Sequence, residues 1–286
     1  MIYSALKRAL LVLDEHGFET FGEEWDEMVI DQIATMSGRY GNLTDATRDL
    51  QDYSAFPAGV GYLFMYAAGH AELVACVLEK AHSACGHPTF NKQKLRVASI
   101  GGGPGSELLG LIKFLHEHQP DSLPEKIVYT VYDKEAGWEH IAAELAESIE
   151  TTIEIVLKFR PLDVTGDCAA VTLEKQDLVM MSFFISEVSN LPKAAEVREA
   201  LKHLLGTIPA DSYLLYNDNS NMAFYGYLNS RRKSAGKFDE VYDSDPHHFD
   251  VPVPDLDGIF EEMIERFERT PKLSAFALSK LLVRVK

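Results

Sequence analysis

The sequence is poor in cysteine, in long apolar runs and in positive charge. Its three cysteines, Cys76, Cys85 and Cys168, are odd in number and far apart, so they form neither a disulfide framework nor a metal site of recognisable spacing. No apolar run approaches the roughly 18 residues of a membrane-spanning helix, and the apolar run near the N-terminus is too short for a signal peptide. These absences indicate a cytoplasmic protein with no membrane partner.

Lysine and arginine are outnumbered, with 27 of them against 44 aspartate and glutamate residues, for a formal net charge of −17. A field of that sign repels nucleic acid unless a local basic patch outweighs it. The only dense basic stretch surrounds Arg231, Arg232 and Lys233, and we expect it to be a solvated loop. Nucleic acid is therefore a disfavoured partner, and the oligomeric state stays open.

The first third of the chain has the periodicity of helices. Apolar residues recur three and four apart in IYSALKRALLVLDEH and EEWDEMVIDQIATMSG, a pattern typical of amphipathic helices. A third stretch places Leu63, Tyr66, His70, Leu73 and Val77 on one helical stripe, where His70 is expected to be a hydrogen-bonded core histidine. Residues 1–90 are predicted to form an N-terminal helical cap.

Residues 91–286 alternate short apolar runs with amphipathic segments. That alternation predicts an α/β fold with parallel strands joined by right-handed crossovers. The last stretch, LSAFALSKLLVRVK, is expected to add antiparallel strands at the edge of the sheet, and VYDSDPHHFDVPVPDLDG to form a long surface loop. The spacing of His247 and His248 among nearby aspartates (Asp243, Asp245 and Asp250) fits no metal site, so no metal is expected.

Glycines concentrate where the first predicted strand meets the first predicted helix, in VASIGGGPGSELLG. Glycine permits the positive φ and the close backbone approach of such a turn, and the free N–H groups of the helix start suit a polar ligand. A dinucleotide fingerprint needs a glycine at the sixth position, but Ser106 stands there. The spacing that fits is G-x-G-x-G, at Gly101, Gly103 and Gly105.

This spacing resembles motif I of the class I S-adenosylmethionine-dependent methyltransferases, and the order of elements from about residue 95 onward is similar to that family's. The resemblance implies that residues 91–286 form a Rossmann-like domain, a seven-stranded mostly parallel sheet with an antiparallel C-terminal strand. It also implies S-adenosyl-L-methionine as cofactor, bound across the carboxyl ends of the first strands. Many members carry an acid two positions before the first glycine, where this sequence has Ser99.

The resemblance places the methyl donor against the ends of the first four strands. Asp133 ends the second strand, where a carboxylate can accept hydrogen bonds from both ribose hydroxyls, although it could instead cap a helix. Asp163, after the third strand, corresponds to an acid near the adenine amino group, with a turn role as the alternative. The predicted cofactor-binding residues are Ser99, Gly101, Gly102, Gly103, Gly105, Asp133, Lys134, Asp163, Val164, Ser182 and Phe183.

The acceptor is expected between the end of the fourth strand and the helical cap. Glu187 could orient an amine acceptor or cap the helix that follows. Aromatic side chains ahead of the sheet suit a cationic sulfonium or amine, although core packing explains the same tyrosines. The predicted catalytic residues are Glu187 and Tyr66, and the predicted substrate-binding residues are Tyr53, Tyr62, Phe184, Asn217 and Asp218.

The sequence thus predicts a methyltransferase that passes a methyl group to a small molecule, with an amine as one candidate, by in-line displacement. A protein acceptor is the first alternative, because sequence does not separate an open cleft from a closed pocket. A methyltransferase-like scaffold without catalysis is the second, given Ser99 and the lack of a signature catalytic tetrapeptide. A nicotinamide-dependent oxidoreductase is weaker, because the sixth-position glycine is missing.

Overall fold

The computed structural model describes residues 1–41, 43, 52–166, 168–191, 193–244, 247–250 and 256–285, with only the backbone at positions 247, 248, 250 and 275. Within these residues, eight strands form one sheet in the order β3-β2-β1-β4-β5-β8-β6, and β7 pairs with β8 off that path. The strands are β1 (Lys94–Ile100), β2 (Lys126–Asp133), β3 (Glu154–Pro161), β4 (Leu178–Ser182), β5 (Tyr213–Asn219), β6 (Phe238–Asp243), β7 (His247–Asp250) and β8 (Ser274–Arg284).

Strands β1 to β5 pair in parallel, whereas β8 is antiparallel to β5, β6 and β7. The predicted α/β fold, a Rossmann-like mostly parallel sheet with an antiparallel C-terminal strand, is therefore confirmed. The strand order reverses between β1 and β4. In open sheets of this kind, ligands bind in the crevice at the carboxyl ends of the two strands that flank the reversal.

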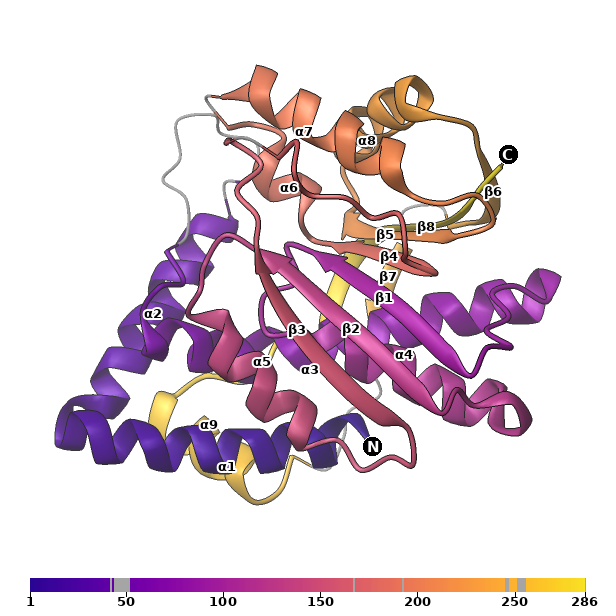
Figure 1. Ribbon diagram of the computed structural model, residues 1–286. Helices are drawn as coiled ribbons and strands as arrows, with labels where there is room; N and C mark the ends of the chain where they lie inside the picture. The colour runs from indigo at the N-terminus through magenta and orange to yellow at the C-terminus, as the bar shows by residue number, and fades with distance from the viewer. Residues whose placement is uncertain are drawn as a thin grey trace.

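Helices cover the sheet on two sides (Figure 1). Along β1, Leu95 and Val97 pack into the core shared with α3 and α4, whereas Ala98 and Ile100 pack into the core shared with α7 and α8, as the two-residue period of a strand requires. The helices are α1 (Ile2–Phe21), α2 (Trp25–Tyr40), α3 (Phe56–Cys85), α4 (Ser106–His118), α5 (Trp138–Glu147), α6 (Ile185–Val188), α7 (Ala194–Thr207), α8 (Met222–Ala235) and α9 (Ile259–Phe267).

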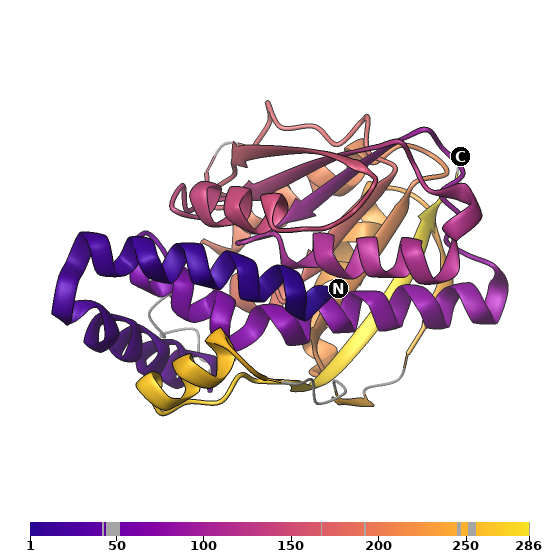
Figure 2. The same ribbon diagram turned by 90° about the horizontal axis from the view of Figure 1, so that it is seen from below.

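Helix α3 connects the N-terminal helices to the sheet. Pro57 lies in its first turn and Gly86, in the left-handed conformation, follows its last, the two residues that most often bound a helix. It is long and apolar enough to cross a membrane, but 78% of its most apolar window is buried inside the protein, as in the core helix of a globular domain. Seen from below, α1 lies along α3 (Figure 2), and both contribute to the core that reaches β1 and β2. The boundary of a separate cap at residue 90 stays a prediction.

Three local expectations were wrong. The segment predicted as one long surface loop forms β6 and β7 in its described parts. The final stretch is one strand, β8, and lies inside the sheet between β5 and β6, because β6 and β7 supply an edge that the acidic sequence did not suggest. The basic stretch belongs to α8, where Arg232 is buried and donates to the carbonyl of Phe238.

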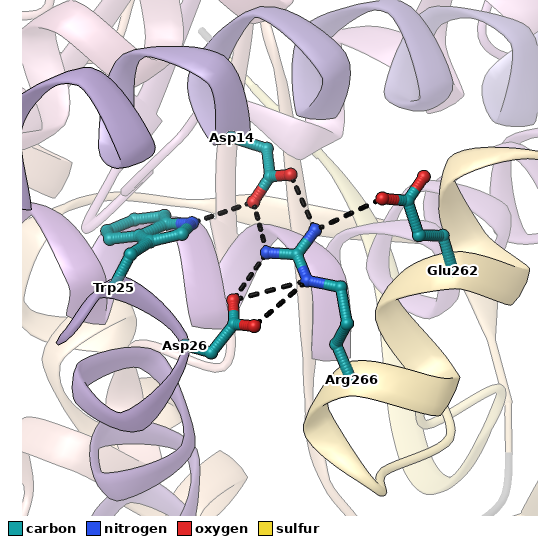
Figure 3. A network of polar contacts seen from close by, with 5 residues as sticks. All are labelled: Asp14, Trp25, Asp26, Glu262 and Arg266. Atoms are coloured by element: carbon teal, nitrogen blue, oxygen red, sulfur yellow. Dashed lines mark hydrogen bonds and ion pairs between the residues drawn. The ribbon is translucent and has the colours of Figure 1, made fainter. Parts of the chain in front are cut away.

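An ion-pair network joins the two ends of the chain (Figure 3). Arg266 of α9 donates from Nη1 to Asp14 Oδ2 (2.7 Å) and from Nε to Asp26 Oδ2 (3.1 Å). Asp14 Oδ1 also accepts from the indole of Trp25 (2.7 Å), and Glu262 lies 3.6 Å from the guanidinium. Asp14 is buried, and both of its carboxylate oxygens accept hydrogen bonds from Arg266 or Trp25. A buried carboxylate is tolerated when it is paired and hydrogen-bonded in this way.

Replacing Arg266 by Met should therefore lower the free energy of unfolding by about 3 kcal/mol, because it leaves Asp14 buried without a counter-ion. Urea denaturation of the variant measures this. The matched control is Arg269→Met, since Arg269 is exposed and donates to the carbonyl of the neighbouring Glu268. Its effect on the free energy of unfolding should stay within about 0.5 kcal/mol. Equal losses in the two variants would show that the network does not hold α9 to the N-terminal helices.

Candidate functional site

The glycine turn lies between β1 and α4, as predicted. Gly101, Gly103 and Gly105 have φ values of +66°, +47° and +78°, a region that residues with a Cβ rarely adopt. A Cβ on Gly101 would also lie 2.3 Å from the ring of Phe184. Both the conformation and the space at Gly101 therefore require glycine.

Asp133 joins the glycine turn directly. It ends β2, the neighbour of β1 in register, and its Oδ2 accepts a hydrogen bond from the Gly103 amide at 3.0 Å. Its Oδ1 accepts from the Glu135 amide at 3.0 Å. Burial raises the pKa of Asp133, while these two amides lower it. The two strongest motifs of the sequence thus form one hydrogen-bonded unit.

That unit lies at a cavity of about 460 Å³ at the carboxyl ends of the strands. Most of the predicted site residues line this cavity: Tyr53, Tyr62, Tyr66, Gly101, Gly103, Asp133, Lys134, Asp163, Val164, Ser182, Phe183, Phe184 and Glu187. The roles given to them remain predictions. The cavity brings together residues from α3, the glycine turn and the ends of β2, β3 and β4, as the strand order requires.

Five predicted residues do not line the cavity: Ser99, Gly102, Gly105, Asn217 and Asp218. Ser99 and Asn217 are buried inside the protein. Asp218 accepts from the amides of Ser186 and Asn219, so its carboxylate is directed to the chain around α6. Asn219, the third polar residue that the sequence places at this edge, lines the cavity instead.

Asp163 makes the turn considered for it and also lines the cavity. Its Oδ1 accepts from the amide (2.8 Å) and the hydroxyl (2.7 Å) of Thr165, a local turn. Burial alone would raise its pKa, but these hydrogen bonds and the charge of Lys134 hold the pKa below its usual value. It is therefore a turn residue that also presents a carboxylate to the cavity.

An aromatic wall closes the side of the cavity formed by the N-terminal helices. The ring centroids of Tyr53 and Tyr62 lie 5.0 Å and 5.3 Å from that of Trp138, and Tyr62 lies 5.3 Å from Tyr66. Tyr40 hydrogen-bonds to Tyr53 through their hydroxyls. Burial raises the pKa of Tyr40, Tyr53 and Tyr62 well above the usual value, so all three hydroxyls are neutral.

Sequence reasoning missed Trp138 and Tyr40. Trp138 follows Asp133 closely and opens α5, at the edge of the sheet where ligands bind, a position that could have been recognised. Tyr40 could not, because its place at the cavity depends on how α2 packs against α3.

His70 lies at the end of this wall. Its ring stacks on Phe183 with centroids 4.1 Å apart and planes at 15°, and its Nδ1 lies 3.1 Å from the Tyr62 hydroxyl. Burial, together with the charge of Lys272, lowers the pKa of His70 to about 3. The expected hydrogen-bonded histidine is confirmed, and it is a neutral imidazole that lines the cavity.

A buried acid lies behind the glycine turn. Glu107, in the first turn of α4, accepts a long hydrogen bond from the Tyr129 hydroxyl at 3.4 Å. Burial raises its pKa to about 7, although the Ser99 and Tyr129 hydroxyls lower it. Ser99 stands two positions before Gly101, and the nearby acid, Glu107, lies on α4 instead.

No group of three His, Cys, Asp or Glu side chains within the described part of the chain is arranged to hold a metal ion. Asp245 lies outside the described residues, and for His247 and His248 only the backbone, in β7, is described.

No protein-family model matches the chain, and no curated protein matches it in sequence. Among solved structures, the trans-methyltransferase CalH in complex with SAH is 13% identical at a TM-score of 0.45, with 97% of this chain and 73% of that chain covered. The CurJ carbon methyltransferase is 12% identical at 0.45, with 96% and 71% covered. The precorrin-6y C5,15-methyltransferase from Geobacter metallireducens GS-15 is 7% identical at 0.42, with 76% and 87% covered.

This chain covers about half the length of two further solved structures, 47% of one and 53% of the other. These likenesses are weak, so we take the fold from the strand order itself and no residue role from these proteins.

The pKa of Glu107 sets a pH dependence of stability. The native state keeps the Glu107 proton up to about pH 7, whereas the unfolded chain loses it near the usual glutamate pKa of 4.5. The free energy of unfolding therefore falls as pH rises through that window. Between pH 4 and pH 8, the free energy of unfolding of the wild type should fall by roughly 3 kcal/mol more than that of Glu107→Gln. Urea denaturation across pH measures the difference.

The control for this prediction is Glu117→Gln, an exposed acid on the same helix, whose difference from wild type should not change with pH. A Glu107→Gln difference that is equally flat would show that folding does not shift the pKa of Glu107.

Proposed function

We propose that the chain is an S-adenosyl-L-methionine-dependent methyltransferase that acts on a small molecule held in the cavity. The observation that carries the proposal is the hydrogen bond between the Gly103 amide and Asp133. It joins a turn that only glycine can form to a carboxylate at the adjacent strand end, at the reversal of the strand order, where a nucleoside and its polar tail would both be held.

The residues present fit the methyl donor. Asp133 keeps lone pairs for two ribose hydroxyls while its amide contacts fix its orientation. Gly101 and Gly103 line the cavity with backbone alone, where we expect the amino-acid part of the donor, and we expect Asp163 and Val164 to contact the adenine ring. The donor brings a methyl group already activated on a sulfonium, so the protein has to bind, orient and exclude water.

Charge supports a cationic donor. The acids that line the cavity are Asp133, Glu135, Asp163 and Glu187, against Lys134 and Lys272. The aromatic wall of Tyr53, Tyr62 and Trp138 adds π faces, which attract a sulfonium. Both features favour a sulfonium over the neutral thioether product, so they assist release after transfer.

A small acceptor is favoured over a protein. A volume of about 460 Å³ is that of a ligand pocket. The N-terminal helices and the segment before β8 border it, and Lys272 of that segment packs directly against α3. The scaffold alternative is distinguished by turnover: a scaffold binds the donor and transfers nothing.

Asp133→Ala should weaken donor binding by about 2–4 kcal/mol, because it removes two charge-assisted hydrogen bonds to the ribose. Isothermal titration with S-adenosyl-L-methionine measures the affinity, and circular dichroism checks the fold. Asp121→Ala, an exposed acid between α4 and β2, is the matched control and should bind the donor normally. Wild-type affinity in Asp133→Ala would remove this carboxylate from the donor site.

Gly101→Ala should lower donor affinity by tenfold or more, because the new Cβ both strains a positive φ and displaces Phe184 into the cavity. The matched control is Gly226→Ala in α8, where a Cβ meets nothing within 4 Å and the change should stabilise the helix by about 0.5–1 kcal/mol. If Gly101→Ala titrates like wild type, the turn does not approach the donor.

A further inference from the structure

A basic groove, separate from the cavity described above, lies on the sheet. It has a volume of about 160 Å³, and the residues that line it are Lys94, Arg96, Val128, Thr130, Lys158, Lys175 and Gln176. Four of the seven carry a positive charge and none carries a negative one. In a chain with a formal net charge of −17, such a lining is the opposite of what the average surface offers.

The period of the strands places the groove on the face of the sheet that lies away from α3 and α4. On β2, Tyr129 and Val131 are buried in the core shared with these two helices, so Thr130, between them, points to the opposite face. Helices usually cover both faces of a parallel sheet, but the described residues between β3 and β4 form no helix. The face toward the amino ends of β1, β2 and β3 is therefore left without a helix over it.

The pairing register brings cations from two strands into the same groove. Arg96 of β1 pairs with Val128 of β2, and Lys158 of β3 pairs with Thr130, two residues further along β2. Two strand spacings and two residue steps place the Cα atoms of Arg96 and Lys158 about 12 Å apart. Since both side chains are long and line the groove, one anion between them can contact both.

The four cations of the groove form no ion pair with any described residue. The acids at the neighbouring strand starts are already paired. Asp177 accepts from Lys92 Nζ at 2.5 Å and from the Arg96 amide at 2.8 Å. Glu154 accepts from Lys126 Nζ at 2.5 Å. The positive charge of the groove is therefore left for a ligand to neutralise.

Two neutral polar groups of the groove also lack partners. Thr130 is only 5% exposed, and its hydroxyl makes no hydrogen bond within the described residues. Gln176 Oε1 is buried and likewise has no partner there. Buried polar groups are rarely left unsatisfied, and an exception can mark the place of a water or an ion. A hydroxyl and a side-chain amide can each donate to an anion.

We propose that this groove binds a compact polyphosphate: inorganic pyrophosphate or the phosphate chain of a nucleotide. Guanidinium and ammonium groups bind phosphate oxygens, and the fork of Arg96 can contact two of them at once. The volume of about 160 Å³ is below the roughly 300–1,000 Å³ of pockets for drug-sized molecules. The groove thus has room for phosphate groups, and a nucleoside would extend outside it.

The proposal does not depend on the proposed function. The groove lies toward the amino ends of the strands, whereas the glycine turn and Asp133 lie at their carboxyl ends. A polyphosphate bound in the groove should therefore leave the affinity for S-adenosyl-L-methionine unchanged.

Calorimetric titration with sodium pyrophosphate, at low salt and without divalent cations, tests the proposal. The double variant Arg96→Gln/Lys158→Gln should bind at least tenfold more weakly, because two charge-assisted contacts are lost. The matched control is Lys202→Gln/Lys233→Gln, two exposed lysines on α7 and α8. It removes the same formal charge and should stay within about twofold of wild type, since distant exposed charges are screened. Thr130→Val keeps the charge and should bind about fivefold more weakly, for the loss of one hydrogen bond.

ATP in place of pyrophosphate separates the two sources of the ligand, with S-adenosylhomocysteine present to occupy the cavity. ATP that binds more tightly than pyrophosphate, and loses that binding in Arg96→Gln/Lys158→Gln, would identify a nucleotide. ATP that binds no more tightly would identify the free anion. Circular dichroism checks that each variant is folded.

A wild-type protein that binds pyrophosphate no more tightly than about 1 mM would overturn the proposal. So would equal losses in the two double variants, or wild-type affinity in Thr130→Val, since either would show attraction by charge alone. Tighter binding of hexaglutamate than of pyrophosphate would assign the face to an acidic protein and overturn it as well. Failure to bind S-adenosyl-L-methionine would bear on the proposed function alone.

Discussion

The close packing of α3 fixes the position of the cavity relative to the sheet. A Cβ on Gly110 of α4 would lie 2.2 Å from the carbonyl oxygen of Ala71, and one on Gly69 would lie 2.8 Å from that of Lys272. The two backbones can approach α3 this closely only because no side chain separates them. The Lys272 amide also donates to the carbonyl of Met65 at 2.7 Å, so the segment that leads into β8 is bound to the helix directly.

This packing places the aromatic stripe of α3 over the strand ends. Tyr62, Tyr66 and His70 lie within two turns of each other, and the positions that alternate with them are buried against α1, α2 and the sheet. A shift of α3 by even one side-chain width would separate His70 from Phe183 and Tyr62 from Trp138. The cavity is thus a product of helix packing on one side and of strand order on the other.

The sequence predicted those features whose cause is local. Backbone sterics require glycine at position 101, and parallel register brings the end of β2 beside the end of β1. The proximity of Asp133 to the glycine turn could therefore be predicted. The edge strands β6 and β7 could not, because these short, acidic segments form strands by pairing with β8. Asn217 and Asp218 were expected at the cavity since they end a strand, but the contact of Asp218 with α6 decides their direction. Glu107 was missed because nothing in an amphipathic helix start shows that its first acid will be buried.

The network around Arg266 has a consequence for synthesis of the chain. Asp14 and Arg266 are separated by 252 residues, which at about 5–20 residues per second corresponds to roughly 10–50 s of translation. During that time the N-terminal helices have left the ribosome, but Asp14 still lacks its counter-ion Arg266. Most of the sheet has also been made before Arg266. Asp14 is thus made long before the residue that neutralises it, and its surroundings reach their final free energy only when α9 packs against them.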